Sequence, residues 1–260
     1  MTSPSEPRTP RLYHAGAGSA LPPLVAVGAL SAGMASMLAI GVVGQAAGLP
    51  VLPLLLAGQL VFLAIPILLM RGQGLRPAAL GLRWPRRDRL FAALLIGATG
   101  WYLNVRLVEL LPFEEGHLRG LERLVDEPPL VVAILAIALV PAVCEEVMFR
   151  GAVQRSLATR LFPIAAIVLT AMLFAGYHLS LIQLLPTFTL GLALGALAHH
   201  GDSVVPSIAA HFLNNTFAIL VSRKQPAALA SWIEVHPTIA LIGCAVATGC
   251  GLTLLARGPA

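Results

Sequence analysis

Eight apolar segments, each about long enough to cross a lipid bilayer, dominate this sequence of 260 residues. A spanning helix needs about 20 mostly apolar residues, because in hydrocarbon a helix must satisfy its backbone polar groups internally. By that measure the expected spans are residues 24–46, 50–70, 90–111, 130–149, 162–178, 181–198, 204–222 and 237–256. The sequence therefore predicts an all-α fold, a polytopic membrane helix bundle with about eight transmembrane helices.

The composition agrees with a chain that lies mostly in lipid. Hydrophobic residues make up 57% of it and charged residues 11%, whereas soluble domains average about 25% charged residues. A net charge of +5 would suggest a nucleic-acid partner in a soluble protein. Here most basic side chains fall between the spans, so the expected partner is the lipid bilayer and no nucleic acid. Residues 1–23 are polar and predict a disordered cytoplasmic tail, and residues 24–260 predict a single transmembrane domain.

Basic residues are distributed unevenly between the two sets of predicted loops. The set that includes both termini holds 12 arginines, and the opposite set holds 4 basic residues. Cytoplasmic loops are enriched in Lys and Arg, so both termini are predicted to be cytoplasmic. Lys224 is the single lysine among 17 basic residues, which is typical of a GC-rich bacterial genome. The expected location is therefore a bacterial inner membrane.

Few ionisable side chains remain inside the spans, where each costs roughly 2.5–3.5 kcal/mol near the bilayer centre. Glu145 and Glu146 are adjacent in the fourth span, and Arg150 follows four residues after Glu146. Side chains four residues apart share one helical face, so Glu146 and Arg150 predict an ion pair. Glu145 points about 100° away from that pair and faces another part of the bundle.

Two histidines and an asparagine are the other informative polar side chains. His178 ends the fifth span, and His211 and Asn215 share one face of the seventh. Taken singly, each of these three residues can serve only to form hydrogen bonds between helices. We expect a structural role of this kind for Arg106 and Glu109, which should pair with each other in the third span. Together with the free carboxylate of the fourth span, they predict one polar site inside the bundle.

Three kinds of chemistry fit this set of side chains. A desolvated Glu145 can act as general base on a water, while His211 and Asn215 donate hydrogen bonds to an oxyanion. Glu145, His178 and His211 can instead ligate Zn²⁺ with an open fourth position, although the sequence has no HExxH motif. The same residues can relay protons or bind a cation in a transporter, but the sequence lacks the internal repeats that transporters usually show.

The order and spacing of these residues resemble the membrane-embedded CAAX prenyl endopeptidases and their bacterial relatives, the CPBP or Abi family. That family carries the motifs EExxxR, FxxxH and HxxxN or HxxxD in this order. The matching segments are 145–150, 174–178 and 211–215. The resemblance covers about residues 130–220, the predicted catalytic core.

The resemblance implies an intramembrane endopeptidase that uses an activated water and forms no covalent intermediate. The implied roles are general base for Glu145, water activation for His178, support for Glu146 and Arg150, and oxyanion stabilisation for His211 and Asn215. A metal-free, glutamic mechanism is favoured because an asparagine and two dispersed histidines make a poor zinc cage. No cofactor is therefore expected, and zinc is the alternative.

A membrane-anchored protein or peptide is the substrate that the resemblance implies. Eukaryotic relatives remove a C-terminal tripeptide after a prenylated cysteine, and the bacterial myxosortase-like branch cleaves C-terminal sorting and anchoring signals. Other bacterial relatives are tied to peptide processing and to bacteriocin self-immunity, and no motif selects among these bacterial roles. The sequence leaves the oligomeric state open. A non-catalytic membrane binding or transport protein is the alternative outside this class.

The predicted span limits place the polar residues at different depths. At about 1.5 Å per residue, Glu145 and His211 should lie roughly 8–10 Å below the cytoplasmic face. His178, at the far end of the fifth span, should come out near the opposite face. Only tilted helices or wrong span limits would bring it to the same site.

Overall fold

The computed structural model describes residues 20–110 and 125–257. Residues 1–19, 111–124 and 258–260 lie outside these ranges, and with them most of the predicted cytoplasmic tail. Every regular element in the described ranges is a helix, which confirms the expected all-α fold. The long helices outside the fourth span are α1 (Pro23–Ala46), α2 (Val51–Gly72), α3 (Arg87–Val108), α9 (Leu181–Gly201), α10 (Val205–Ser222) and α12 (Pro237–Ala256). The short elements are η1 (Pro77–Leu80), α8 (Pro163–Tyr177) and α11 (Ala227–Val235).

The fourth span is longer than predicted. One helix of 28 residues, Leu130–Leu157, takes the place of residues 130–149. It consists of α5 (Leu130–Ala133), π-helical η3 (Ile134–Leu139), α6 (Val140–Glu146), π-helical η4 (Val147–Gln154) and α7 (Arg155–Leu157). The predicted end at residue 149 was wrong, since the helix continues to Leu157. Arg150 and Arg155 instead lie inside the protein, with 0% and 3% of their surfaces exposed.

The fifth predicted span is shorter than a membrane crossing. Seven helices in the described ranges are long and apolar enough to cross a membrane, and α8 is not among them. Its 15 residues extend about 22 Å, whereas the hydrocarbon core is about 30 Å thick. Seven of the eight predicted spans are thus long enough to cross, and α8 reaches only part of the way.

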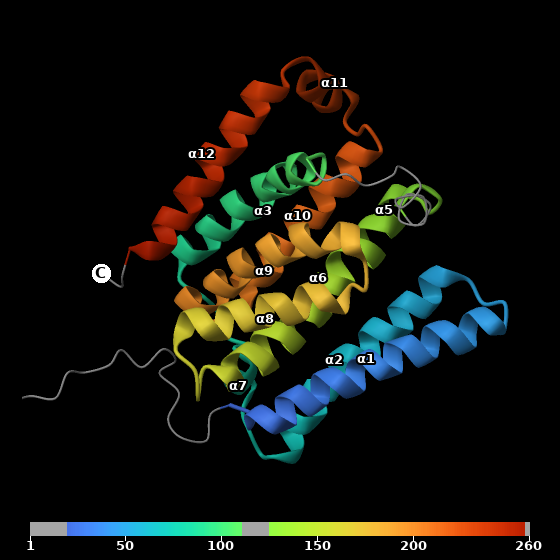
Figure 1. The fold of residues 1–260 in the computed structure, drawn as a ribbon, viewed down its shortest axis with the longest axis vertical. Coiled ribbons are helices and arrows are strands. Elements are labelled where there is room, and N and C mark those ends of the chain that lie inside the picture. Colours follow the sequence, from blue (N-terminus) through green and yellow to red (C-terminus); the bar gives the residue numbers. More distant parts are fainter. Residues whose placement is uncertain (1–19, 111–124, 258–260) are drawn as a thin grey trace, which may run out of the picture.

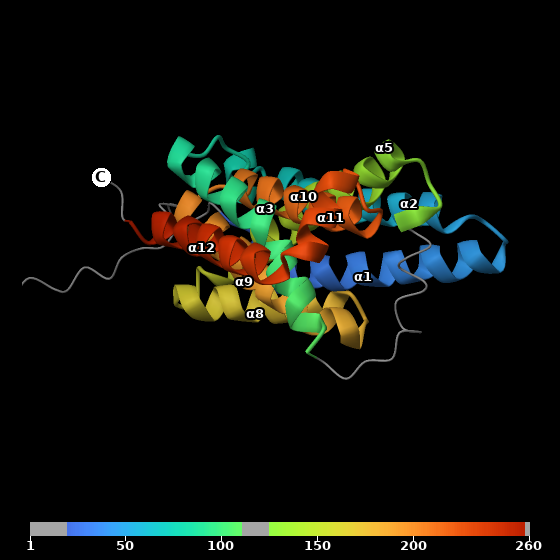
Figure 2. The ribbon, with the colours of Figure 1, turned by 90° about the horizontal axis from the view of Figure 1, so that it is seen from above.

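The helix Leu130–Leu157 occupies the middle of the bundle, where α6 packs against both α2 and α10. Figure 1 shows the α1–α2 hairpin on one side of it and α3 with α12 on the other. Helix α8 packs along α9. In Figure 2 the long helices run side by side in the same general direction, as expected for a membrane bundle.

Four segments predicted to share one membrane face are joined at one end of the bundle. Asp202, after α9, forms ion pairs with Arg83 at 2.5 Å and with Arg155 at 2.8 Å. Arg89 donates hydrogen bonds to the carbonyls of Leu254 and Leu255, each at 2.8 Å. The connection before α3, the end of α7, the turn after α9 and the end of α12 therefore lie together.

Helices α3 and α10 approach closely at Gly97. A Cβ atom at this position would lie 2.5 Å from the backbone oxygen of Ala210. Only glycine allows this approach, because the nearest atoms are backbone and cannot rotate away. Gly97 therefore fixes the distance between α3 and the part of α10 that carries the next residue, His211.

Candidate active site

The two adjacent glutamates lie at a junction between α-helical and π-helical segments. Glu145 and Glu146 are the last residues of α6, which has π-helical η3 before it and π-helical η4 after it. Single π-helical turns within α-helices are rare in proteins, but those that occur are often found at functional sites. The backbone around the carboxylates thus departs from regular α-helical geometry on both sides.

Glu146 and Arg150 form the ion pair that their spacing predicts. Arg150 Nη1 lies 2.7 Å from Glu146 Oε1, and both side chains are 0% exposed. The guanidinium also donates from Nη2 to the carbonyl of Gly191 at 3.1 Å and lies 4.4 Å from the ring centre of Phe174. A charge buried this completely needs such partners, because an unpaired one costs several kcal/mol.

His211 lies between the two carboxylates. Its Nδ1 is 3.0 Å from Glu146 Oε1, and its Nε2 is 3.9 Å from Glu145 Oε2. A carboxylate only accepts hydrogen bonds, so Nδ1 carries the hydrogen donated to Glu146. Nε2 is then an acceptor in the neutral ring and a second donor in the protonated ring. The imidazole therefore faces Glu145 with Nε2 and Glu146 with Nδ1.

Glu145 has a partner that the sequence did not predict. Gln59, on α2, donates from Nε2 to Glu145 Oε1 at 2.8 Å. Both residues are buried, at 3% and 4% exposure. An amide inside an apolar span was the available signal, but a single glutamine there is also common in helix packing. Another glutamine, Gln154, illustrates that role by donating to the carbonyl of Gly195 at 2.9 Å.

His178 is separated from His211 by the ring of Phe174. It follows the last residue of α8, is half-buried, and donates from Nδ1 to the carbonyl of Phe174 at 2.9 Å. The Phe174 ring meets both imidazoles edge to face, at 5.0 Å from His178 and 5.8 Å from His211 between ring centres. The described contacts of His178 include no hydrogen bond to either glutamate.

The expected difference in depth between Glu145 and His178 was wrong. Glu145 lies 12 residues before the end of the long helix at Leu157, rather than 4 residues before an end at residue 149. Helix α8 starts next to that helix end and carries His178 at about 22 Å from its own first residue, Pro163. The longer fourth helix and the short α8 thus bring the two side chains to similar depths.

Asn215 lies on the predicted face of α10 but is directed to the backbone of η3. Its Nδ2 is 3.5 Å from the carbonyl of Ile137, and its Oδ1 accepts a hydrogen bond of 3.2 Å from Asn214. The structure therefore brings His211 together with Glu145 and Glu146. Asn215 lies one helical turn further along α10. Its second amide hydrogen has no acceptor among the described residues.

Ligation of Zn²⁺ by Glu145, His178 and His211 was the alternative to the metal-free mechanism. No three His, Cys, Asp or Glu side chains within residues 20–110 and 125–257 are grouped closely enough to hold a metal ion. Instead, His211 uses Nδ1 to contact Glu146, and His178 uses Nδ1 to contact its own helix. The described side chains therefore form hydrogen-bonded pairs and not an assembled ligand set.

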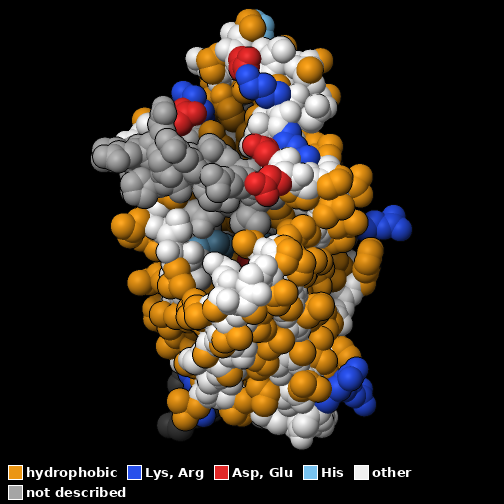
Figure 3. All heavy atoms as spheres, turned by 90° about the vertical axis from the view of Figure 1, so that its right-hand side faces the viewer, with side chains coloured by type: hydrophobic (Ala, Val, Ile, Leu, Met, Phe, Trp, Pro, Cys, Tyr) orange, Lys and Arg blue, Asp and Glu red, His pale blue; other side chains and the backbone are white. Residues whose placement is uncertain are grey.

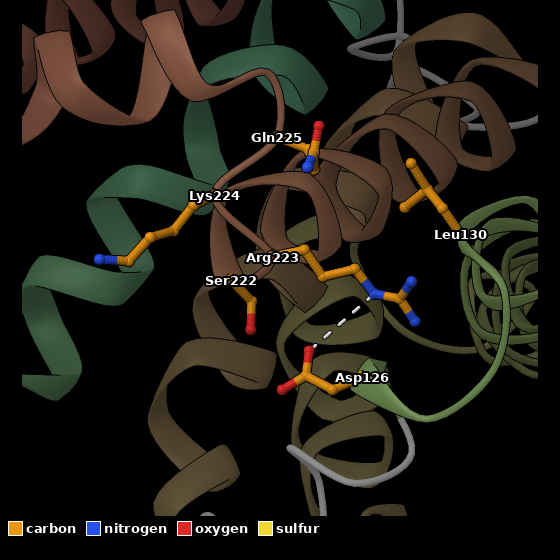
Figure 4. A pocket seen from close by; sticks show the side chains of 6 residues that line it. All are labelled: Asp126, Leu130, Ser222, Arg223, Lys224 and Gln225. Carbon is orange, nitrogen blue, oxygen red and sulfur yellow. Dashed lines mark ion pairs between the residues drawn. The ribbon is translucent and has the colours of Figure 1, made fainter.

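The surface carries two hollows of interest. Figure 3 faces the end of the bundle that holds the α1–α2 turn and shows a histidine side chain in a hollow of this surface. A second cavity of about 510 Å³ lies at the end of α10 (Figure 4). Its lining residues are Asp126, Leu130, Ser222, Arg223, Lys224 and Gln225. None of the predicted site residues lines this second cavity.

Comparison with known proteins identifies a family for the central part of the chain. Residues 127–217 match the family model described as Type II CAAX prenyl endopeptidase Rce1-like. No curated protein and no solved structure matches the chain. The matched segment contains both glutamates, both histidines and Asn215, and it supports the family resemblance drawn from their spacing. Residues 127–217, about a third of the chain, are therefore similar to the Rce1-like type II CAAX prenyl endopeptidases, within a multi-pass membrane protein.

Proposed function

We propose that the protein is an intramembrane endopeptidase that hydrolyses a peptide bond of a membrane-associated protein or peptide. The observation that carries this proposal is the buried cluster of Glu145, Glu146 and His211 inside a domain that matches the CAAX endopeptidases. Buried ionisable groups in membrane segments are costly, and they mark functional sites more often than packing sites. Arg106 and Glu109, by contrast, pair at 2.5 Å with more than a third of each side chain exposed.

Glu145 is the general base in this proposal. Gln59 holds Oε1, so Oε2 is the oxygen available to a water. The water gives a proton to Oε2 while its oxygen attacks the carbonyl carbon of the substrate. As the C–N bond breaks, the same proton passes to the departing amine, and no covalent intermediate forms. His178 assists, because a neutral ring that donates from Nδ1 leaves Nε2 as an acceptor for a water hydrogen.

His211 and Asn215 stabilise the oxyanion of the tetrahedral intermediate. A His211 ring protonated on both nitrogens donates from Nδ1 to Glu146 and has its Nε2 hydrogen available for the oxyanion. Asn215 supplies the amide hydrogen that Ile137 does not use. Donors of this kind are effective because they are already oriented and lie in a medium of low dielectric constant. Glu146 and Arg150 support the site by holding His211.

The membrane, the orientation and the substrate are part of the same proposal. Exposed arginines gather in the connection from α2 to α3, at the end of the bundle where α7, α9 and α12 also finish: Arg71, Arg76, Arg83, Arg86 and Arg87. An end rich in arginine fits the cytoplasmic side of a bacterial inner membrane, with both termini there. We propose a substrate whose C-terminal sorting or anchoring segment is cleaved.

The test uses the purified full chain in liposomes and two probes. One is a quenched fluorescent peptide with a farnesylated cysteine before three C-terminal residues, and the other is a single-span protein with an apolar C-terminal segment and a basic cluster. Products are identified by mass spectrometry. The wild type should cleave at least one probe, and Glu145→Gln should lower the rate by roughly 100-fold or more, the range for loss of a general base.

Glu109→Gln is the control, since it removes a half-exposed carboxylate that directly follows α3 and pairs with Arg106 instead of with the cluster. It should cleave at the wild-type rate. Equal cleavage by the wild type and Glu145→Gln would contradict the proposal, as would a wild type that cleaves neither probe.

A further inference from the structure

The α1–α2 hairpin lies outside the segment that matches the endopeptidase family, yet it contributes a side chain to the site. Residues 127–217 include Glu145, whereas its hydrogen-bond donor Gln59 is on α2. We infer that Gln59 is a positioning residue that orients the Glu145 carboxylate, so that the α1–α2 hairpin completes the active site. This inference rests on the proposed function and adds a residue to it.

The contact itself fixes which carboxylate oxygen is available for reaction. The Gln59 amide donates to Oε1 at 2.8 Å, and Oε2 is left on the side of His211 Nε2, 3.9 Å away. Without this donor the carboxylate could rotate about its terminal bond, because that torsion has broad minima. Gln59 therefore keeps one oxygen of Glu145 directed toward the imidazole.

Aromatic packing holds α2 in the register that this contact needs. Phe62, three residues after Gln59 on the same face of α2, is fully buried. Its ring lies 5.7 Å from that of Phe149 in η4 and is stacked at 5.1 Å on that of Tyr177 in α8. The side chain of Phe62 thus anchors α2 against the two elements that also bear the site.

The amide nitrogen of Gln59 has a second partner besides the Glu145 carboxylate. Its Nε2 also lies 3.4 Å from the Tyr177 hydroxyl, which itself donates to Met37 Sδ at 2.9 Å. Its Oε1 is buried and has no hydrogen-bond partner among the described residues. Here the donor end is satisfied by the carboxylate and the phenol, and the acceptor end is not.

The experiment compares three variants on whichever probe the wild type cleaves in liposomes. Gln59→Met keeps the shape of the side chain and removes the donor, whereas Gln59→His keeps an N–H donor at similar reach. Gln154→Met removes a buried glutamine whose amide donates to the carbonyl of Gly195. The values of kcat and KM are measured for each, together with the midpoint of thermal unfolding.

If Gln59 positions the Glu145 carboxylate, its substitution should change kcat and leave KM nearly unchanged. Gln59→Met should lower kcat by roughly 10-fold to 100-fold, the range for a misplaced reacting group, with KM changed less than about 2-fold. Gln59→His should recover at least part of that loss. Gln154→Met should lower the unfolding midpoint about as much as Gln59→Met does but leave kcat near the wild-type value.

Two results would overturn the inference while leaving the proposed function intact. One is a Gln59→Met variant with wild-type kcat in a protein that still depends on Glu145. The other is a parallel loss of kcat in Gln59→Met, Gln59→His and Gln154→Met, in proportion to lost stability, which would indicate packing alone. Failure of the proposed function has a different signature, because the wild type would then cleave neither probe or would not need Glu145.

Discussion

His211 and Glu146 are joined by a hydrogen bond of 3.0 Å between Nδ1 and Oε1. The same oxygen receives the Arg150 guanidinium at 2.7 Å. One buried carboxylate thus compensates a buried cation and orients the imidazole that faces Glu145. The two adjacent glutamates thus have different partners, and mutation of each should have a different effect.

Glu146→Gln should destabilise the protein far more than Glu145→Gln does. It leaves the Arg150 charge without its counterion at a position with 0% exposure, and breaking a buried pair costs about 3–5 kcal/mol. No arginine or lysine is paired with Glu145 among the described residues and its hydrogen-bond donor Gln59 is neutral, so substitution of Glu145 should lower the unfolding midpoint less. Thermal unfolding in detergent checks the difference, and equal midpoints for the two variants would contradict it.

Gly97→Ala should impair both stability and activity. The new Cβ would lie 2.5 Å from the Ala210 oxygen, so α10 must shift and carry His211 with it. Overpacking of this kind costs about 1–3 kcal/mol. Gly100→Ala, in the same helix, is the control because its Cβ would meet no atom within 4 Å. The unfolding midpoint and cleavage rate are measured for both, and a harmless Gly97→Ala would show that this close approach is not needed.

Phe174→Ala should lower both the stability of the protein and its cleavage activity. The Phe174 ring contacts the Arg150 guanidinium and packs edge to face against the imidazoles of His178 and His211. Loss of a fully buried phenylalanine costs about 3–5 kcal/mol, and we expect cleavage to fall as well. Phe162→Ala removes a phenylalanine that is 70% exposed and should change neither property. Similar unfolding midpoints for these two variants would be incompatible with a structural role of the Phe174 ring.

Chelator treatment should leave cleavage unchanged if the glutamic mechanism is right. The basis is the arrangement of Glu145, His178 and His211, in which both imidazoles use Nδ1 for protein hydrogen bonds and three ligands are not grouped. Elemental analysis of the purified protein accompanies the assay. Stoichiometric zinc together with chelator-sensitive cleavage would instead support the zinc-dependent version of the protease.

Local spacing in the sequence determined the features that depend on one helix. Runs of apolar residues identified the membrane helices, because a hydrocarbon environment requires both length and continuous hydrophobicity. The spacing of four residues predicted the ion pair of Glu146 with Arg150, since helix geometry alone brings such side chains together. The order of the motifs also indicated the endopeptidase family that residues 127–217 match.

Only the tertiary structure decided which helices meet and at what depth. The Gln59–Glu145 contact joins residues 86 positions apart, and no periodicity in either helix encodes that pairing. The true end of the long helix at Leu157 depended on partners for Arg150 that lie on other helices, because an arginine is tolerated in the interior only when its charge is compensated. Composition and periodicity thus specify single helices, whereas the site requires the packing of α2, α6, α8 and α10 against one another.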